Sequence, residues 1–328
     1  MFPLAIVGLG PAGIFTVASL PEDMLHNTLL LEQSCVGGDL YSYYSEVTAN
    51  IHKAWFIKTL LSIPKWAGQT FPELDTYTDA ENPKLADICK ILRRLIEPDI
   101  RKAHFQNTAL THLIETEGGW SLVTAKGTRF QAKRVILCLG ATPKTMDLPI
   151  RSIPLPIALS RKLAHSVSPT DKIVVFGISH SGIVVIKNLK NLGCTNVHVI
   201  YKGKDPFIVE TYKGIPLSGS LIFHTIDKKE WGPLTPTFIN YDDSEAIHRV
   251  LQNADAVIYA IGFEPRVLTY TNKTGDCLPI TNDTPGIYGF GIGRPRMGKS
   301  IVGEVFVDIG FEGFIKAIHA ELPVILQK

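Results

Sequence analysis

The chain opens on a run of hydrophobic residues that is continuous rather than alternating. Residues 4–7 are apolar at every position, as in parallel strands that are buried on both faces. A glycine-rich turn follows, and the next apolar stretch predicts a helix over about residues 11–20. A second apolar strand, residues 28–31, leads into Glu32. The pattern therefore predicts a strand-helix-strand unit at the start of the chain.

The turn of this unit carries Gly8, Gly10 and Gly13 at the spacing GxGxxG. One glycine permits the tight turn, the next lets the backbone approach a diphosphate, and the third lets the helix pack on the strand. The helix N-terminus offers N–H groups to the diphosphate, and Glu32, nineteen positions beyond Gly13, is placed to accept ribose hydroxyls. We interpret the unit as a dinucleotide site, because three glycines would cost an ordinary core helix about 1 kcal/mol each.

The same pattern occurs again in the middle of the chain. A strand at 172–176, a helix to about Leu192 and a strand at 197–200 surround the turn GISHSG of residues 177–182. Ser179 stands where the first unit has its middle glycine, so the approach of backbone to phosphate is more hindered. The sequence therefore predicts a second, looser dinucleotide site.

The residues after the second unit point to a different ligand. In place of Glu32 the second unit has Tyr201, followed by Lys202 and Lys204. A carboxylate would repel a 2′-phosphate, whereas lysines pair with it and tyrosine stacks on adenine. We expect NADPH rather than NADH here; the alternative is that the lysines form a solvated turn.

Hydrophobic periodicity elsewhere predicts supporting elements. Residues 83–102 have apolar positions at helical spacing and predict a helix that packs on the first unit, and residues 105–128 predict an antiparallel meander. Two further apolar strands end in glycine, at Gly140 and Gly262. Residues 206–240, rich in proline and glycine, predict a loop excursion.

Composition and charge exclude several classes of protein. Against 31 acidic residues there are 33 basic ones, a net charge of +2, so we expect no surface that attracts nucleic acid or an anionic membrane. The first cation is Lys53, unlike a secretory signal, and glycines and a proline interrupt the opening apolar run, unlike a transmembrane helix. The five cysteines show no CxxC and no metal-ligand spacing. We expect a cytoplasmic protein without a metal site.

Taken in order, the two units, the Gly37-Gly38 pair, the strands that end in glycine and the motif TPGIYG at 284–289 form a specific set. The set resembles the two-dinucleotide-binding flavoproteins, which include thioredoxin-reductase-like enzymes and flavin-containing monooxygenases, over nearly the whole chain. The resemblance implies an α/β fold of two Rossmann-like three-layer domains. A discontinuous FAD domain, residues 1–149 and 271–328, would carry an inserted NAD(P)H domain, residues 150–270.

The resemblance also implies the residues that bind FAD and NADPH. The expected cofactor-binding residues are Gly8, Gly10, Pro11, Ala12, Gly13, Glu32, Gly38, Gly140, Gly177, Ser179, His180, Ser181, Gly182, Tyr201, Lys202, Gly262, Gly291 and Arg294. Arg294 and its neighbour Arg296 are candidates for contact with FAD phosphate or with NADPH. No Ser-His-Asp, HExxH or P-loop pattern is present, and no catalytic residue is assigned, because in such proteins the cofactor itself performs the hydride transfer.

Three departures from the superfamily narrow the function. Thioredoxin reductases carry a CxxC just before or within the second unit, whereas residues 157–172 hold no cysteine, so we expect no dithiol relay and interpret Cys35 as a packed thiol. The usual Gly-Asp pair after the third motif is replaced by Gly291-Ile292, although residues 306–322 predict the terminal helix that would point at the flavin, and Asp308 is a candidate to compensate. The fingerprint of Baeyer-Villiger monooxygenases is absent.

The stretch of residues 41–55 is dense in aromatic and hydrogen-bonding side chains. It either lines the flavin or substrate, or packs beneath the inserted domain. We interpret His52 within it as a structural histidine.

Three functions remain open from the sequence. The first is a reductase that passes electrons to a small molecule, a quinone or a redox protein. The second is an N- or S-oxygenating flavoprotein. The third, suggested by the altered third motif, is a non-catalytic nucleotide-binding protein that senses redox state or binds a partner. A homodimer is compatible with each.

Overall fold

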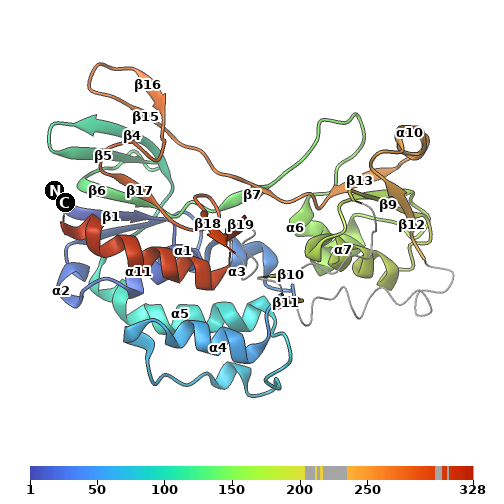
Figure 1. The fold of residues 1–328 in the computed structure, drawn as a ribbon. Coiled ribbons are helices and arrows are strands. Elements are labelled where there is room, and N and C mark those ends of the chain that lie inside the picture. Colours follow the sequence, from blue (N-terminus) through green and yellow to red (C-terminus); the bar gives the residue numbers. More distant parts are fainter. Residues whose placement is uncertain (204–210, 213–214, 217–234, 300–304, 309, 328) are drawn as a thin grey trace.

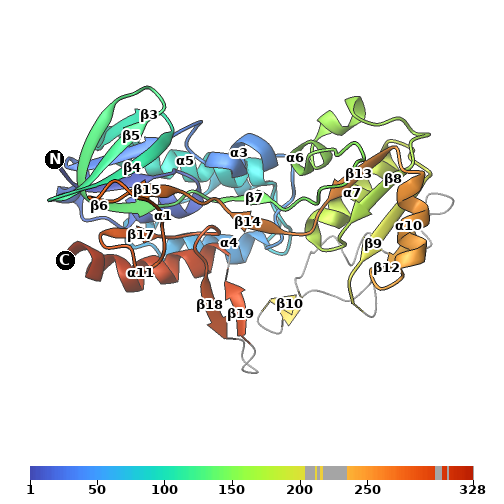
Figure 2. The ribbon, with the colours of Figure 1, turned by 90° about the horizontal axis from the view of Figure 1, so that it is seen from above.

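The computed structural model describes residues 1–203, 211–212, 215–216, 235–299, 305–308 and 310–327. Two sheets, each with its own helices, form two lobes (Figure 1). The chain crosses between the lobes twice, and the two crossings pair as antiparallel strands, β7 (Ala141–Pro143) and β14 (Phe263–Pro265) (Figure 2). The predicted α/β fold with two Rossmann-like units is confirmed.

The first lobe is built on a nine-stranded sheet of order β16-β15-β4-β5-β6-β1-β2-β3, in which β17 also pairs with β6. Its parallel strands are β1 (Phe2–Val7), β2 (Thr28–Glu32), β3 (His104–Asn107), β6 (Arg129–Leu137) and β17 (Ile287–Gly289). An antiparallel extension follows, made of β4 (Leu110–Thr116) and β5 (Gly119–Thr124), with β15 (Thr269–Thr271) parallel to β4 and β16 (Cys277–Pro279) at the edge.

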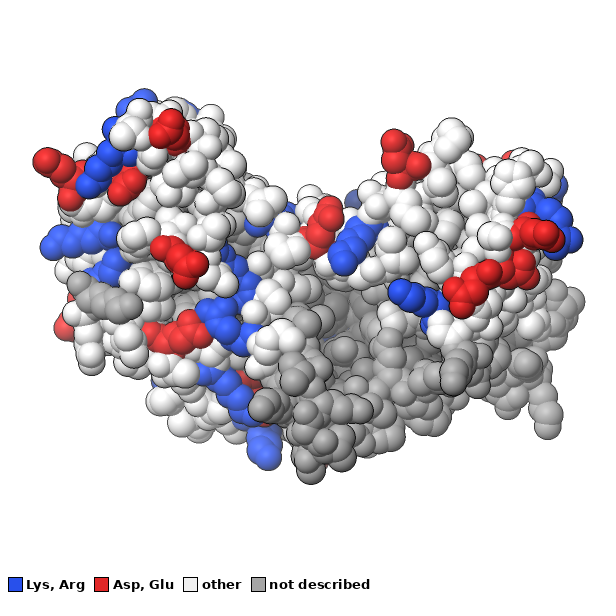
Figure 3. All heavy atoms as spheres, turned by 45° about the horizontal axis from the view of Figure 1, so that its top comes forward, with Lys and Arg blue, Asp and Glu red and all other residues white. Residues whose placement is uncertain are grey.

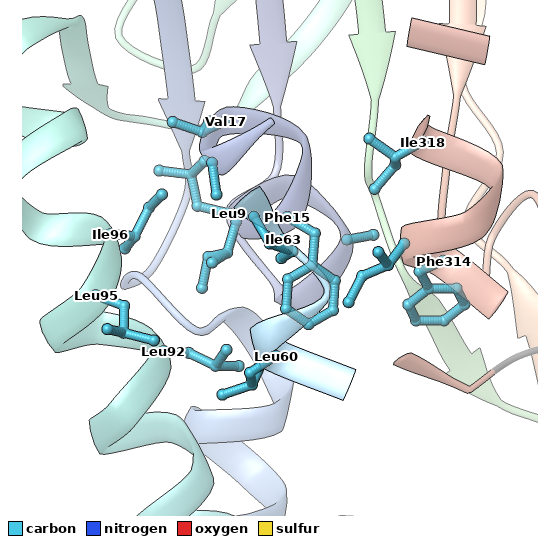
Figure 4. Close-up of a cluster of buried hydrophobic side chains, with 14 of the residues drawn as sticks. Leu9, Phe15, Val17, Leu60, Ile63, Leu92, Leu95, Ile96, Phe314 and Ile318 are labelled. Atoms are coloured by element: carbon cyan, nitrogen blue, oxygen red, sulfur yellow. The ribbon is translucent and has the colours of Figure 1, made fainter. Parts of the chain in front are cut away.

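The helices of this lobe pack around one buried helix, α1 (Pro11–Ala18), in which every residue from Ala12 onward is buried. On either side of α1 lie α5 (Leu85–Lys102) and α11 (Phe311–Gln327), and Figure 4 shows their side chains meeting around Phe15. Phe15 contacts Trp66 and Phe311 edge to face. The remaining helices are α2 (Glu22–Leu25), α3 (Gly38–Tyr44), α4 (Lys53–Leu61) and the short 3₁₀ turns η1 (Pro64–Trp66) and η2 (Pro72–Leu74).

The second lobe has a four-stranded parallel sheet of order β12-β9-β8-β13. Its strands are β8 (Ile173–Phe176), β9 (Val197–Tyr201), β12 (Thr237–Asn240) and β13 (Ala256–Tyr259). Its helices are α6 (Leu155–Ala158), η3 (Arg161–His165), α7 (His180–Asn191) and α10 (Ser244–Gln252). Both sheets thus repeat the strand-helix-strand unit predicted from the hydrophobic pattern.

Besides β7 and β14, four short strands of the described chain lie outside the two sheets. They form two antiparallel pairs, β10 (Thr211–Tyr212) with β11 (Ile215–Pro216), and β18 (Arg296–Lys299) with β19 (Val305–Asp308). The strands of the first sheet fall within residues 2–137 and 269–289, and those of the second within 173–259. The domain boundaries proposed from the sequence stay a prediction.

Three predicted elements were wrong in their limits. The terminal helix begins at Phe311 rather than at residue 306, because Val305–Asp308, rich in strand-forming valine and phenylalanine, pairs with β18. The antiparallel meander begins at Leu110, because residues 104–107 pair in parallel with β2. Residues 237–240 form strand β12 instead of a loop, whereas Lys204 and most of the predicted loop lie outside the described residues.

Candidate active site

One large cavity of about 1170 Å³ lies where the two lobes meet. Gly8, Gly10 and Pro11 line it from the first lobe, and His180 and Ser181 line it from the second. These residues follow the carboxyl ends of β1 and β8, beside β6 and β13, where the strand order of each sheet reverses. Such switch points are where open α/β sheets bind ligands. Figure 3 shows the notch between the lobes on one face, with acidic and basic side chains interspersed around it.

The first turn is built by two close backbone contacts and one open space. Gly8 has φ of +92°, and a Cβ on it would lie 2.3 Å from the carbonyl oxygen of Cys138. A Cβ on Gly13 would lie 1.9 Å from the carbonyl oxygen of Gly8. A Cβ on Gly10, by contrast, would meet nothing within 4 Å. Gly8 and Gly13 therefore serve the fold, and Gly10 leaves room for a ligand at the N-terminus of α1.

The second turn repeats these contacts. Gly177 has φ of +95°, and its Cβ would lie 2.3 Å from the carbonyl oxygen of Ala260; a Cβ on Gly182 would lie 2.3 Å from that of Gly177. Ser179, the N-cap of α7, occupies the position of Gly10. The two turns therefore have the same backbone structure. They differ in that the side chain of Ser179 fills, in the second turn, the space that Gly10 leaves open in the first.

Glu32 is a buried carboxylate at the end of β2, with only 4% of its surface exposed, and it lines the cavity. Its Oε2 accepts a hydrogen bond from the N–H of Leu9 at 2.6 Å, and its Oε1 accepts from the N–H and the hydroxyl of Ser34 at 2.9 and 3.1 Å. An ionised carboxylate has about four acceptor positions. The carboxylate is thus held in place with capacity left for a ribose hydroxyl.

The third motif closes the cavity against α1. A Cβ on Gly291 would lie 2.7 Å from the Cβ of Ala12, and one on Gly293 would lie 2.4 Å from the carbonyl oxygen of Gly140. Ile292, the residue that replaces the usual aspartate, lines the cavity. Phe311, Glu312 and Phe314 of α11 also line it. Ile292 therefore places an apolar side chain where the superfamily has a carboxylate, and Glu312 is the carboxylate that α11 contributes to this wall.

The structure brings about half of the expected cofactor-binding residues to the cavity. Those that line it are Gly8, Gly10, Pro11, Glu32, Gly38, Gly140, His180 and Ser181. Those that do not are Ala12, Gly13, Gly177, Ser179, Gly182, Tyr201, Lys202, Gly262, Gly291 and Arg294. Gly13, Gly177 and Gly182 of the second group pack closely against neighbouring backbone in the turns. Tyr201, which is half-buried, and Lys202, which is exposed, lie at the end of β9.

The two arginines of the third motif make contacts inside the protein. Arg294 donates to the carbonyl oxygen of Thr281 at 3.2 Å and to Oδ1 of Asn282 at 3.1 Å. Arg296 forms a two-pronged ion pair with Glu321 of α11, at 2.6 Å for each bond. Both line a smaller pocket of about 400 Å³ rather than the large cavity. Through these contacts Arg294 stabilises the loop before β17, and Arg296 stabilises α11.

Three contacts that the sequence did not reveal join distant parts of the chain at the cavity. His180 Nε2 lies 3.1 Å from the carbonyl oxygen of Thr48 and must donate, because a carbonyl only accepts. Burial lowers the pKa of His180. Arg266 forms an ion pair with Asp39, and Tyr44 packs edge to face on Phe263 with ring centroids 6.1 Å apart.

Within the aromatic stretch of residues 41–55, some side chains line the cavity and others make structural contacts. Tyr44, Ile51 and Trp55 line the cavity, whereas Tyr41 lies beneath the guanidinium of Arg93. His52 is structural, as predicted: it caps α4, its Nδ1 accepting from the N–H of Trp55. The hydrophobic pattern of the sequence does not indicate which of these side chains line the cavity and which do not.

All five cysteines are free thiols, and Cys138 alone among them lines the cavity. Burial raises the pKa of Cys138 to about 12, and its Sγ lies 3.9 Å from the hydroxyl of Thr16. Such a thiol is not a nucleophile at neutral pH. Within the described ranges, histidine, cysteine and carboxylate side chains form no group of three that would hold a metal, and no helix there is long and apolar enough to cross a membrane.

Comparison with known families gives one decisive match. Residues 5–277 match the family described as pyridine nucleotide-disulphide oxidoreductase. The chain belongs to this family. The predicted membership of the two-dinucleotide-binding flavoproteins is thereby confirmed, and this pyridine nucleotide-disulphide oxidoreductase has both of the glycine turns from which that membership was predicted.

Solved structures with the same fold cover the whole chain at low sequence identity. Bacillithiol disulfide reductase from Staphylococcus aureus is 14% identical, with a TM-score of 0.60 and 98% of each chain covered. A flavin-containing monooxygenase from Stenotrophomonas maltophilia is 14% identical, with a TM-score of 0.63, over 100% of this chain and 99% of the other. Thioredoxin reductase from Lactococcus lactis is 16% identical, with a TM-score of 0.56 over both whole chains. No curated protein matches the sequence.

Proposed function

We propose that this oxidoreductase binds FAD at the first turn and NADPH at the second, and passes electrons from NADPH by way of the flavin to an acceptor without a redox disulfide. The observation that carries the proposal is the shared cavity, since residues of both turns line the same space of about 1170 Å³. Pockets for one small ligand usually measure about 300–1,000 Å³. The cavity therefore has room for the reactive parts of two ligands side by side.

The residues of the first turn fit a dinucleotide. The open position at Gly10 and the N-terminus of α1 suit a diphosphate, and Glu32 suits the adenosine ribose. When bound, FAD accepts a hydride from a nicotinamide and holds its two electrons for an acceptor. The protein would supply binding, orientation and the exclusion of water.

The second turn supports NADPH through the residues that follow it. Tyr201 ends β9, and Lys202 comes next and is exposed, as a residue that pairs with a 2′-phosphate must be. His180, which the Thr48 carbonyl holds at the start of α7, lines the cavity and would help to position NADPH there. We therefore propose NADPH as the hydride donor.

The chemistry of the cysteines supports a direct transfer to the acceptor. The Sγ of Cys138 is buried with a strongly raised pKa, and the remaining four cysteines do not line the cavity. A relay through protein thiols needs two cysteines close together beside the flavin. Electrons would therefore leave the flavin directly.

Cofactor content and acceptor dependence test the proposal. Purified protein should carry FAD, measured by visible absorbance and by release on denaturation, and should oxidise NADPH only when an acceptor is added. Replacing all five cysteines with serine or alanine should leave the acceptor-dependent rate within about twofold. A colourless protein that takes up no added FAD would overturn the proposal in favour of a non-catalytic nucleotide sensor.

An N- or S-oxygenating activity is the second candidate. The apolar wall made by Ile292 and Phe314 favours it, because such a wall would keep water away from the flavin. Oxygenation would appear as oxygen uptake with an oxidised amine or sulfide as product. Reduction of an acceptor under argon at full rate would favour the reductase instead.

A further inference from the structure

The part of the cavity between the two turns has walls of a distinct kind. The segment from the end of α3 to the start of α4 faces the second lobe there, and its cavity-lining side chains include Tyr44, Val47, Ile51 and Trp55. Phe263 of β14, whose ring contacts that of Tyr44, and Leu159 also line this part. Apolar and aromatic surfaces of this kind suit a flat, uncharged ligand.

Charge is nearly absent from this part of the cavity. Among the described lining residues the only arginine or lysine is Arg266, and its charge is taken up by Asp39. Of the other carboxylates, Glu32 is held by backbone and by Ser34, Glu312 pairs with Lys316, and Glu264 is exposed at the rim. An anionic acceptor would find no free cation among these residues and would lose hydration on entering.

Polar groups in this part of the cavity that have no hydrogen-bond partner in the described protein include Nδ1 of His180 and the hydroxyl of Tyr44. Because Nε2 of His180 donates to the Thr48 carbonyl, Nδ1 of the neutral ring only accepts, whereas the hydroxyl of Tyr44 can donate. The hydroxyl of Tyr44 makes no hydrogen bond to a described residue, although the ring is fixed against Phe263. Burial and the nearby charge of Asp39 raise the pKa of Tyr44 to about 12. The phenol therefore stays protonated at neutral pH and presents a hydrogen-bond donor inside an apolar cavity.

We propose that the electron acceptor is an uncharged quinone, held between the lobes with one carbonyl oxygen hydrogen-bonded to the hydroxyl of Tyr44. The inference rests on the proposed function, because the electrons come from NADPH through the flavin. The quinone gains two electrons and two protons and leaves as a hydroquinone. NADPH supplies both electrons and one proton as a hydride, and solvent supplies the second proton, while Tyr44 donates a hydrogen bond and keeps its own proton.

A pair of acceptors that differ only in charge gives the first test. We compare naphthoquinone with its ring-sulfonated derivative under argon, and expect kcat/KM for the neutral quinone to be higher by about tenfold or more. The sulfonate group makes the ring the stronger oxidant, so driving force alone would give the opposite order. Equal values, or a preference for the sulfonate, would overturn the inference.

A pair of tyrosine variants gives the second test. Tyr44→Phe removes the donor, whereas Tyr43→Phe changes a neighbouring ring that is 53% exposed and does not line the cavity. Calorimetry with the oxidised protein should show naphthoquinone binding about tenfold more weakly to Tyr44→Phe and unchanged in Tyr43→Phe, as expected for one lost hydrogen bond of about 1.4 kcal/mol. In turnover, KM for the quinone should rise while kcat changes less. Equal binding by both variants would overturn the role of Tyr44.

Ferricyanide separates this inference from the proposed function, because it takes electrons without needing a fitted site. If the protein reduces ferricyanide with NADPH but shows no preference for neutral quinones, the quinone inference is wrong and the proposed function still holds. If NADPH does not reduce the flavin, the proposed function is wrong. Calorimetry would still decide whether the cavity binds neutral quinones through Tyr44, because binding needs no turnover.

Discussion

Gly10 and Ser179 have the same backbone conformation at the same step of the two glycine-containing turns. Gly10 has φ and ψ of −68° and −176°, and Ser179 has −71° and −171°. Both are extended, a conformation that any residue adopts. The two turns therefore differ in space: the serine side chain fills the position that Gly10 leaves open, where we propose that the FAD diphosphate binds.

Gly10→Ser should weaken FAD binding without harming the fold. Because a Cβ at this position meets nothing within 4 Å, the apoprotein should keep its Tm. Crowding against the diphosphate should cost roughly 1–3 kcal/mol, or about 10- to 100-fold in the Kd for FAD. Fluorescence titration of the apoprotein with FAD measures this. Ser179→Gly is the matched control and should leave FAD affinity unchanged; equal FAD affinity in Gly10→Ser and the native protein would contradict the assignment.

Gly13→Ala should destabilise the fold itself. The new Cβ would lie 1.9 Å from the carbonyl oxygen of Gly8, a backbone atom in the turn that cannot move without distorting it. We expect a loss of at least about 1–3 kcal/mol in the free energy of unfolding, measured by urea denaturation. Gly10→Ala, a substitution of the same size into open space, is the control. Similar free energies of unfolding for the two variants would show that Gly13 does not pack against the carbonyl oxygen of Gly8 as described.

Lys202→Ala should reduce the preference for NADPH over NADH. An exposed lysine paired with a 2′-phosphate contributes a charge-assisted bond, so the ratio of kcat/KM for the two nucleotides should fall by about tenfold. The rate with NADH should change little. Lys187→Ala, an exposed lysine on α7, controls for the loss of charge from the lobe. An unchanged ratio of kcat/KM values would show that Lys202 lies in a solvated turn and does not pair with the 2′-phosphate.

His180 should make the protein less stable as the pH falls. Burial lowers the pKa of His180 below its usual 6.5, so below that pH the unfolded chain binds a proton that the folded protein does not. The stability is therefore fully present above pH 6.5 and is lost as the pH falls through the folded pKa. His180→Gln, which keeps a donor for the Thr48 carbonyl, should show a shallower loss in urea denaturation between about pH 7.5 and pH 5. An identical slope would rule His180 out as the cause; His198, whose pKa burial also lowers, accounts for part of the remaining slope.

The sequence predicted the two turns because their requirements are local. Gly8 and Gly177 take left-handed conformations, and Gly13 and Gly182 admit no Cβ, so the spacing of glycines carries the whole geometry. Glu32 follows from the same unit. Outside such a unit, the spacing of residues does not determine which way a side chain points. Among the clustered tyrosines, Tyr44 lines the cavity while Tyr43 faces solvent, and no periodicity distinguishes them.

Contacts between distant parts of the chain were the part that the sequence could not supply. The Arg266–Asp39 ion pair and the hydrogen bond from His180 to Thr48 join residues far apart in the chain. They depend on how α3 and the segment after it pack against the crossing strands and the second lobe, which no local pattern fixes. Arg294 shows the same limit: its place beside the third motif suggested a cofactor contact, whereas its guanidinium is bonded to the loop at Thr281 and Asn282.

An anaerobic titration with NADPH tests the central claim most directly. Purified protein loaded with FAD is titrated while the visible absorbance of the flavin is recorded. The account predicts that the absorbance bleaches with stoichiometric NADPH and returns when naphthoquinone is added, because both nucleotide turns open into one cavity. A flavin that stays oxidised through an excess of NADPH would contradict the account and would leave the two turns as binding sites without hydride transfer between them.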